Sequence, residues 1–206
     1  MRRSKYYIIA FVGLLVVSIL TSMTLGRYWI DPIKIFTTLP QVDRPDIVNV
    51  IVVNYRLPRI LTAVMVGAIL SSTGVALQSI LRNPLVDSYI LGISSGAAFG
   101  ATLAISLFPQ VPIEVSAFIF SLVALMLTIS IASIGGYNPS LSIVLAGIAI
   151  TALFSAAIAI VKYLIPDPNM LASIIFWIMG SFAHTNWGRV VELTAVSYTH
   201  LRAHET

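Results

Sequence analysis

The chain has 206 residues, of which 58% are hydrophobic and 10% are charged, and its formal net charge is +4. A soluble domain of this length carries far more charge, so the composition excludes an ordinary soluble globular protein and favours a membrane protein. The basic residues stand singly at the edges of apolar runs, which argues against nucleic-acid binding, and the absence of cysteine excludes disulfides and thiolate chemistry.

The first apolar run, residues 6–25, follows the basic residues Arg2, Arg3 and Lys5. About 20 apolar residues span a bilayer core as one helix. A cleaved signal peptide is the alternative, but no small-residue cleavage site follows the run. The basic start predicts a cytoplasmic N-terminus by the positive-inside rule.

Residues 26–55 form a polar interval, which this topology places outside the cell. Its three prolines argue against one continuous helix. Residues 47–53 are β-branched and too few to span the bilayer, and their periodicity leaves a short interfacial helix and a strand equally open.

The second predicted span, residues 60–81, follows Arg56, Pro58 and Arg59. Its one amide, Gln78, either bonds a neighbouring helix or lines a transport path. Residues 82–88 form an inner turn. The third predicted span, residues 89–108, contains two overlapping GxxxG steps, which are typical of closely packed membrane helices, at Gly92, Gly96 and Gly100.

The fourth and fifth predicted spans are residues 115–134 and 140–161, joined by a tight inner turn with Asn138 and Pro139. The fifth is rich in small residues, including Gly147, which suits a crowded interior. Residues 171–183 are too few to cross and predict a re-entrant or interfacial helix. Residues 188–195 begin a sixth span. Residues 196–206 depart from this pattern, so we interpret them as a non-native tail.

Catalytic motifs are absent from the sequence, which contains no GxSxG, no HExxH and no phosphate-binding P-loop. His200 and His204 have metal-ligand spacing without a third ligand, so we predict no metal site and no cofactor. The five complete predicted spans hold no Asp, Glu, Lys, Arg or His, which counts against a proton-coupled carrier. Of the functions considered, there remains a passive conduit or scaffold that needs energy from elsewhere.

An ordered series of motifs between residues 25 and 187 resembles the FecCD family of ABC importer permeases. The motifs are RLPR (56–59), GAIL (67–70), GVALQ (74–78), RNPLVD (82–87), LGISSGA (91–97), LAGIA (145–149) and WIMGSF (177–182). The resemblance implies an all-α membrane protein, a polytopic transmembrane helix bundle of the type II importer kind. Residues 1–195 then form a partial permease domain with about five complete spans of an expected ten.

The resemblance also implies a function and partners. The cargo would be an iron-siderophore, haem or cobalamin complex crossing the bacterial inner membrane. The partners would be a second permease subunit, identical or paralogous, two cytoplasmic ATPase subunits and an extracytoplasmic substrate-binding protein. A non-transporting scaffold or assembly factor and a secondary transporter are the alternative functions.

Residue roles follow from the same resemblance. Arg56 and Arg59 would dock the binding protein through its carboxylates, with lipid phosphates or local carbonyls as alternative partners. Reversing both charges to Glu is then expected to spare folding and abolish docking. Asn138 and Pro139 would form the inner-gate turn. The remaining candidates would line the pathway or pack the helices: Gln78, Gly92, Gly96, Gly100 and Gly147.

Overall fold

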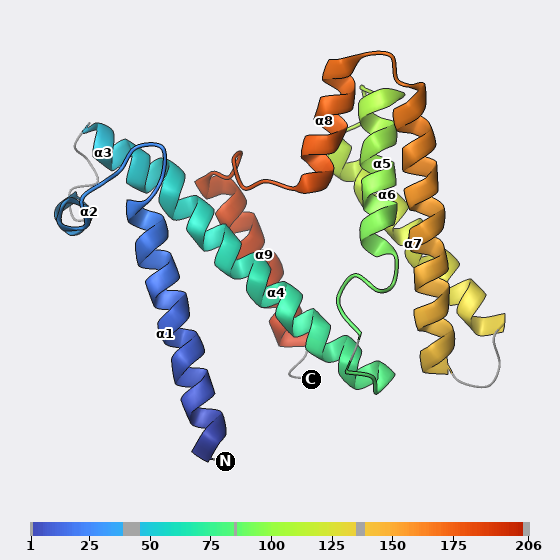
Figure 1. Ribbon diagram of the computed structural model, residues 1–206, viewed down its shortest axis with the longest axis horizontal. Coiled ribbons are helices and arrows are strands. Elements are labelled where there is room, and N and C mark those ends of the chain that lie inside the picture. Colours follow the sequence, from blue (N-terminus) through green and yellow to red (C-terminus); the bar gives the residue numbers. More distant parts are fainter. Residues whose placement is uncertain (1, 39–45, 85, 135–138, 204–206) are drawn as a thin grey trace. The chain divides into compact units, whose positions relative to one another are not determined.

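The computed structural model describes residues 2–38, 46–84, 86–134 and 139–203 (Figure 1). These residues form helices and no strands, which confirms the predicted all-α fold. They divide into two compact units, Met1–Ile69 with Phe182–Thr206, and Leu70–Ser181. The division falls within one long helix, and each unit is described by itself.

The first unit contains α1 (Arg2–Thr24), α2 (Pro32–Thr38), α3 (Ile47–Asn49), the π-helical η1 (Val50–Arg56), the first half of α4 (Leu57–Leu81) and α9 (Trp187–Ala203). Asp46 caps α3 by accepting a hydrogen bond from the Val48 N–H. A small apolar core joins the end of α1 to the helices that follow it, and its buried members are Met23, Ile30, Ile35, Val48 and Val52.

Residues 47–53 are helical and continue without interruption into α4. The apolar helix therefore runs from Ile47 to Leu81, 35 residues, rather than beginning near residue 60, and the stretch of it that crosses the membrane stays a prediction. Proline and the two arginines suggested a boundary at residues 56–59. A π-helical turn before Pro58 carries the chain through that point instead.

The second unit contains the end of α4, α5 (Ile93–Ser106), α6 (Ile113–Ile134), α7 (Pro139–Leu164) and α8 (Pro168–Met179). Helix α5 packs against α6, α7 and α8 (Figure 1). Phe99 of α5 meets Phe120 of α6 edge to face, with ring centroids 5.2 Å apart, and the centroid of Phe154 of α7 lies 5.4 Å from that of Phe99.

Four helices in the described part of the chain are long and apolar enough to cross a membrane: Lys5–Thr24, Ile47–Leu81, Ile113–Ile134 and Pro139–Leu164. The predicted third span, residues 89–108, is not a full crossing helix. Helix α5 has only 14 residues, or about 21 Å at 1.5 Å per residue. Hydropathy alone does not reveal that the residues before Ile93 leave the helix.

The two C-terminal helices also differ from prediction in their bounds. The short helix expected at residues 171–183 is α8, Pro168–Met179, which Asp167 caps through the Asn169 N–H. The segment expected to start a sixth span at residue 188 is α9, which continues to Ala203 and so enters residues 196–206. That these last residues are non-native stays a prediction.

Large apolar side chains remain exposed along the long helices. Phe11 of α1, Phe118 of α6 and Leu153 of α7 are 71%, 64% and 56% exposed. Water is a poor solvent for such surfaces, whereas a lipid bilayer suits them. The fold is therefore that of a multi-pass membrane protein.

Candidate functional site

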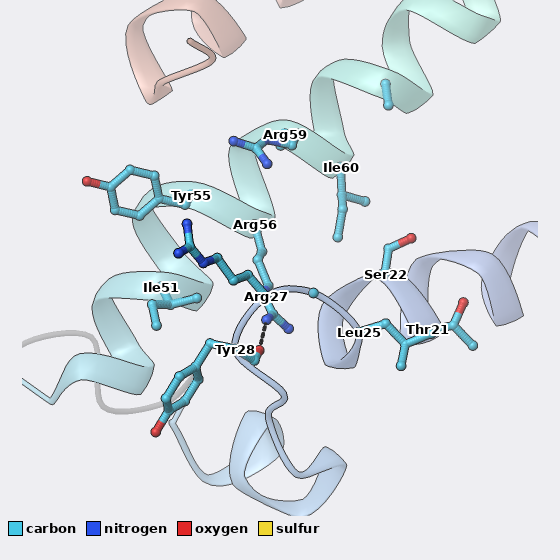
Figure 2. Close-up of a pocket in the computed structure, with 12 residues that line it drawn as sticks. Thr21, Ser22, Leu25, Arg27, Tyr28, Ile51, Tyr55, Arg56, Arg59 and Ile60 are labelled. Atoms are coloured by element: carbon cyan, nitrogen blue, oxygen red, sulfur yellow. Dashed lines mark hydrogen bonds between the residues drawn. The ribbon is translucent and has the colours of Figure 1, made fainter. Parts of the chain in front are cut away.

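Arg56 is the last residue of η1, and its side chain turns back onto the end of α1. Its two terminal nitrogens donate hydrogen bonds to the backbone carbonyls of Met23 and Tyr28. Figure 2 shows the bond to Tyr28. Gly26 lies so close that a Cβ there would stand 2.9 Å from the Arg56 guanidinium. Arg56 thus holds the turn after α1 from both sides.

Arg59, one turn further along, is exposed and binds a different part of the same unit. Its Nε and terminal nitrogen donate to the carbonyls of Phe182 and Ala183, at 3.2 and 3.3 Å. In this structure both predicted docking arginines therefore have local carbonyl partners, the alternative that the sequence left open. Binding-protein docking by Arg56 and Arg59 stays a proposal.

The expectation that reversing both charges would spare folding does not suit the geometry of Arg56. A carboxylate at residue 56 would face two backbone carbonyls that now accept hydrogen bonds, and oxygen would meet oxygen. Unsatisfied acceptors near a bilayer are costly. A docking test should therefore use a guanidinium that the fold does not need.

A pocket of ≈ 570 Å³ lies beside Arg56 and contains such a group. Arg27, from the loop after α1, lines it together with Arg56 and Arg59 (Figure 2). Arg27 is exposed, and its guanidinium makes no hydrogen bond or ion pair within the described residues. The described lining contains no acidic side chain. Sequence motifs do not single out Arg27; its only signal is its place just after the first span.

The start of α4 shows how the chain accommodates Pro58. The Leu57 N–H donates to the Val52 carbonyl, five residues back. In the same pattern, the backbone N–H of residue 58 would donate to the Val53 carbonyl. Proline has no N–H to donate. The Trp187 indole N–H donates to the Val53 carbonyl instead, at 3.0 Å. A side chain 134 residues away in sequence thus replaces the missing backbone donor.

Residues 82–84 and 86–92, between α4 and α5, are not helical, and side chains donate hydrogen bonds to two of their carbonyls. Gln78 donates to the Val86 carbonyl at 3.0 Å, and Thr128 of α6 donates to the Leu91 carbonyl at 3.0 Å. The Ser88 hydroxyl donates back to the Leu70 carbonyl of α4 at 2.8 Å, so the segment returns alongside that helix. Backbone that leaves a helix within a membrane protein needs such partners where it is packed inside the protein. Gln78 therefore bonds an irregular segment in this structure, and a pathway role for it stays a proposal.

Two glycines fit this segment against α7. Gly92 caps the start of α5 with φ +74°, a conformation that L side chains rarely adopt. Gly147 of α7 packs directly on the Ile90 carbonyl, where a Cβ would overlap the oxygen. The turn before α5 can therefore lie on the backbone of α7.

Gly96 and Gly100 face α6. A Cβ on Gly96 would stand 2.5 Å from the Phe120 carbonyl oxygen and 2.6 Å from the Ala124 Cβ. The Ser116 hydroxyl donates to the Gly100 carbonyl at 2.7 Å. These two glycines thus allow α5 and α6 to meet backbone to backbone, and a pathway role for them stays a proposal.

The inner-gate candidates are only partly within the described residues. Asn138 lies outside them, and Pro139 is the first residue of α7, a position that tolerates proline because no helical donor is lost there.

Within the described chain no three His, Cys, Asp or Glu side chains gather to hold a metal ion. The side chains of His200 and His204 lie outside the described part.

The fold and the arginine-lined pocket together define a multi-pass helical membrane protein with a cationic site at the end of its first span. The sequence model of the FecCD transport family matches residues 14–201, and the chain belongs to this family.

Several curated relatives are similar over most of the chain. The molybdate import system permease protein MolB of Haemophilus influenzae is 37% identical over 183 residues, covering 86% of this chain and 54% of that protein. The hemin transport system permease protein HmuU of Yersinia pestis is 38% identical, covering 86% and 54%. The Fe(3+)-citrate import system permease protein YfmE of Bacillus subtilis is 32% identical, covering 92% and 56%.

A solved structure of an inward-facing metal-chelate type ABC transporter is also similar. It is 36% identical in sequence, with a TM-score of 0.69, covering 91% of this chain and 57% of the other. The chain therefore spans about half the length of the curated relatives and of the solved structure that it matches.

Proposed function

We propose that this chain is part of the membrane-spanning permease subunit of an ABC importer that carries a bulky metal chelate. The observation that carries this proposal is the family match over residues 14–201. Relatives named for hemin, Fe(3+)-citrate and cobalamin import support the chelate class, which includes iron-siderophore, haem and cobalamin complexes.

Energy for transport comes from other subunits, since the sequence contains no P-loop. The working assembly has a second permease subunit, two cytoplasmic ATPase subunits and an extracytoplasmic binding protein. The basic residues Arg2, Arg3 and Lys5 precede the apolar stretch of α1, so the N-terminus lies in the cytoplasm of a bacterial cell. The arginine-lined pocket, at the other end of α1, then faces the binding protein.

The transport path runs beside α7 in this proposal. Gly147 brings α7 onto the irregular turn at Ile90, and Pro139, which with Asn138 would form the inner gate, begins the same helix. Backbone that leaves a helix inside a membrane protein is tolerated where it is packed in protein or lines a cavity. A large cargo needs wide passage between subunits more than a deep polar site, which suits helices rich in small side chains.

Uptake by cells tests the function directly. The complete gene, with its ATPase and binding-protein genes, should restore uptake of a radiolabelled iron-siderophore, haem or cobalamin in a strain lacking its own permease. Uptake should stop on ATP depletion and persist when the proton gradient is collapsed. Restoration of none of these cargoes would refute the chelate proposal, and the reverse energy dependence would identify a secondary transporter.

Molybdate is the second candidate cargo, because the molybdate permease of Haemophilus influenzae is as similar as the hemin permease, at 37% against 38% identity. Molybdate is a small oxyanion, whereas the chelates are bulky. Uptake of labelled molybdate without uptake of any chelate would select this alternative.

A further inference from the structure

The pocket beside Arg56 combines guanidinium groups with apolar and hydroxyl side chains of two membrane helices. We propose that it binds an anionic phospholipid, with the lipid phosphate on Arg27 and the first part of an acyl chain between α1 and α4. The inference requires only that these two helices cross a membrane, so it does not depend on the proposed transport function.

Both helices place the pocket at the edge of the hydrocarbon layer. The apolar stretch Lys5–Thr24 of α1 has 20 residues and extends about 30 Å, which is the thickness of that layer. Residues 60–81 of α4, between Arg59 and Arg82, extend about 33 Å. Each helix thus reaches the boundary where its first arginine stands, and the two boundaries meet at the pocket.

The depth of the pocket favours a lipid over a protein partner. Its lining includes Thr21 of α1 and Ala63 of α4, which lie about one turn on the hydrocarbon side of these boundaries. A water-soluble protein does not enter that layer, and a docked one would rest above it. Apolar side chains of Leu25 and Ile60 line the same space, so they can contact an acyl chain.

The pocket also has room for a headgroup. Its volume of ≈ 570 Å³ falls within the range of about 300–1,000 Å³ that is usual for small-molecule sites. Figure 2 shows Ser22 of α1 and Ile60 of α4 on facing sides of this space. A phospholipid could therefore enter sideways from the bilayer, between the two helices.

Arg27 is the group in this pocket best placed to hold the phosphate. Its guanidinium makes no hydrogen bond or ion pair within the described residues, whereas Arg56 bonds the carbonyls of Met23 and Tyr28. A planar guanidinium with all its donors available can bind two phosphate oxygens through parallel hydrogen bonds. The described lining contains no acidic side chain, so the ammonium of a zwitterionic headgroup would meet only positive charge. The site therefore favours a lipid with a net negative charge.

Lipid binding to the full-length permease, purified in detergent, tests the inference. The probes are dioleoyl phosphatidylglycerol and dioleoyl phosphatidylcholine, which share acyl chains and differ in charge, and native mass spectrometry gives an apparent Kd for each. Phosphatidylglycerol should bind the parent about fivefold more tightly, the contribution usual for one basic residue near anionic lipid. Arg27→Gln should remove this preference. Lys162→Gln, the matched control, removes a cation near the end of α7 outside the pocket and should retain the preference.

A second pair of variants tests the acyl-chain part of the site. Ala63 is exposed and lines the pocket, so Ala63→Phe should fill the space between the helices and weaken phosphatidylglycerol binding about fivefold. Ala68 is exposed on the same helix but does not line the pocket, so Ala68→Phe should have no effect. Glycerol 3-phosphate and inorganic phosphate, at the concentration of the lipid, should not compete with it.

Three results would overturn the inference. Equal Kd values of the two lipids in the parent, or an unchanged preference in Arg27→Gln, would show that the pocket holds no anionic headgroup. Competition by a soluble phosphate, with no effect of Ala63→Phe, would identify a free phosphate compound as the ligand. Weaker docking of a binding protein by Arg27→Gln, with the lipid preference intact, would make Arg27 a protein contact. Cargo uptake is measured separately, so failure here leaves the proposed function standing.

Discussion

Replacing Gly96 by alanine should destabilise the protein, although alanine is the better helix former. The added Cβ would lie 2.5 Å from the Phe120 carbonyl oxygen, and that oxygen belongs to the backbone of α6. Ordinary contact needs about 3.5 Å, so α6 must move back by roughly 1 Å. The same movement would loosen the edge-to-face contact of Phe99 with Phe120.

The expected change in stability is the overpacking cost less the gain from exchanging glycine for alanine in a helix. Overpacking a close contact costs roughly 1–3 kcal/mol, and exchanging glycine for alanine within a helix returns up to about 1 kcal/mol. We therefore expect a net loss of roughly 1–2 kcal/mol for Gly96→Ala. Gly96→Leu should go further and lower the folded yield, because a branched side chain has no room against backbone.

Gly67→Ala is the matched control, since Gly67 also lies within a membrane helix but a Cβ added there would have nothing within 4 Å. It should leave stability unchanged or raise it slightly. The assay is thermal unfolding of the full-length protein in detergent, followed by the monodisperse fraction in size exclusion. If Gly96→Ala unfolds at the same temperature as Gly67→Ala, the close approach of α5 and α6 is not as described.

Two hydrogen bonds to irregular backbone give further predictions. Trp187→Phe removes the donor to the Val53 carbonyl and should cost about 0.5–1 kcal/mol, whereas Trp29→Phe, at an exposed indole, should cost nothing measurable in the same thermal assay. Equal effects of the two changes would contradict the proline explanation. Gln78→Leu leaves a carbonyl of the irregular segment unsatisfied and should cost about 1–3 kcal/mol, while Ser79→Ala, on the exposed side of α4, should be neutral. A neutral Gln78→Leu would show that the segment has another donor.

The sequence predicts the long helices well, because a run of about 20 apolar residues without charge has few alternatives in a bilayer. Residues 115–134 and 140–161 became α6 and α7 with small changes at their ends. The glycine spacing at Gly96 and Gly100 indicated close packing, and the structure brings these residues against α6. Local composition carries this information.

The features that the sequence does not reveal depend on partners far along the chain. Pro58 suggested a helix boundary because proline lacks a backbone N–H. The sequence does not show that the Trp187 indole donates to the Val53 carbonyl in its place. The third apolar run suggested a full span because hydropathy does not show that Thr128 and Gln78 can satisfy irregular backbone. The pocket also depends on residues that are far apart in the sequence. Arg27 is 29 residues before Arg56, and only the turn after α1 brings them together.

The bonds from Arg56 also constrain the order in which the membrane protein is built. The last carbonyls of a helix have no partner within it, and the one at Met23 receives its donor from a residue made 33 positions later. Until the ribosome has produced that residue, water or lipid headgroups must solvate the end of α1, which keeps it at the bilayer surface. The end of α1 therefore reaches its final hydrogen bonding only after Arg56 has been made.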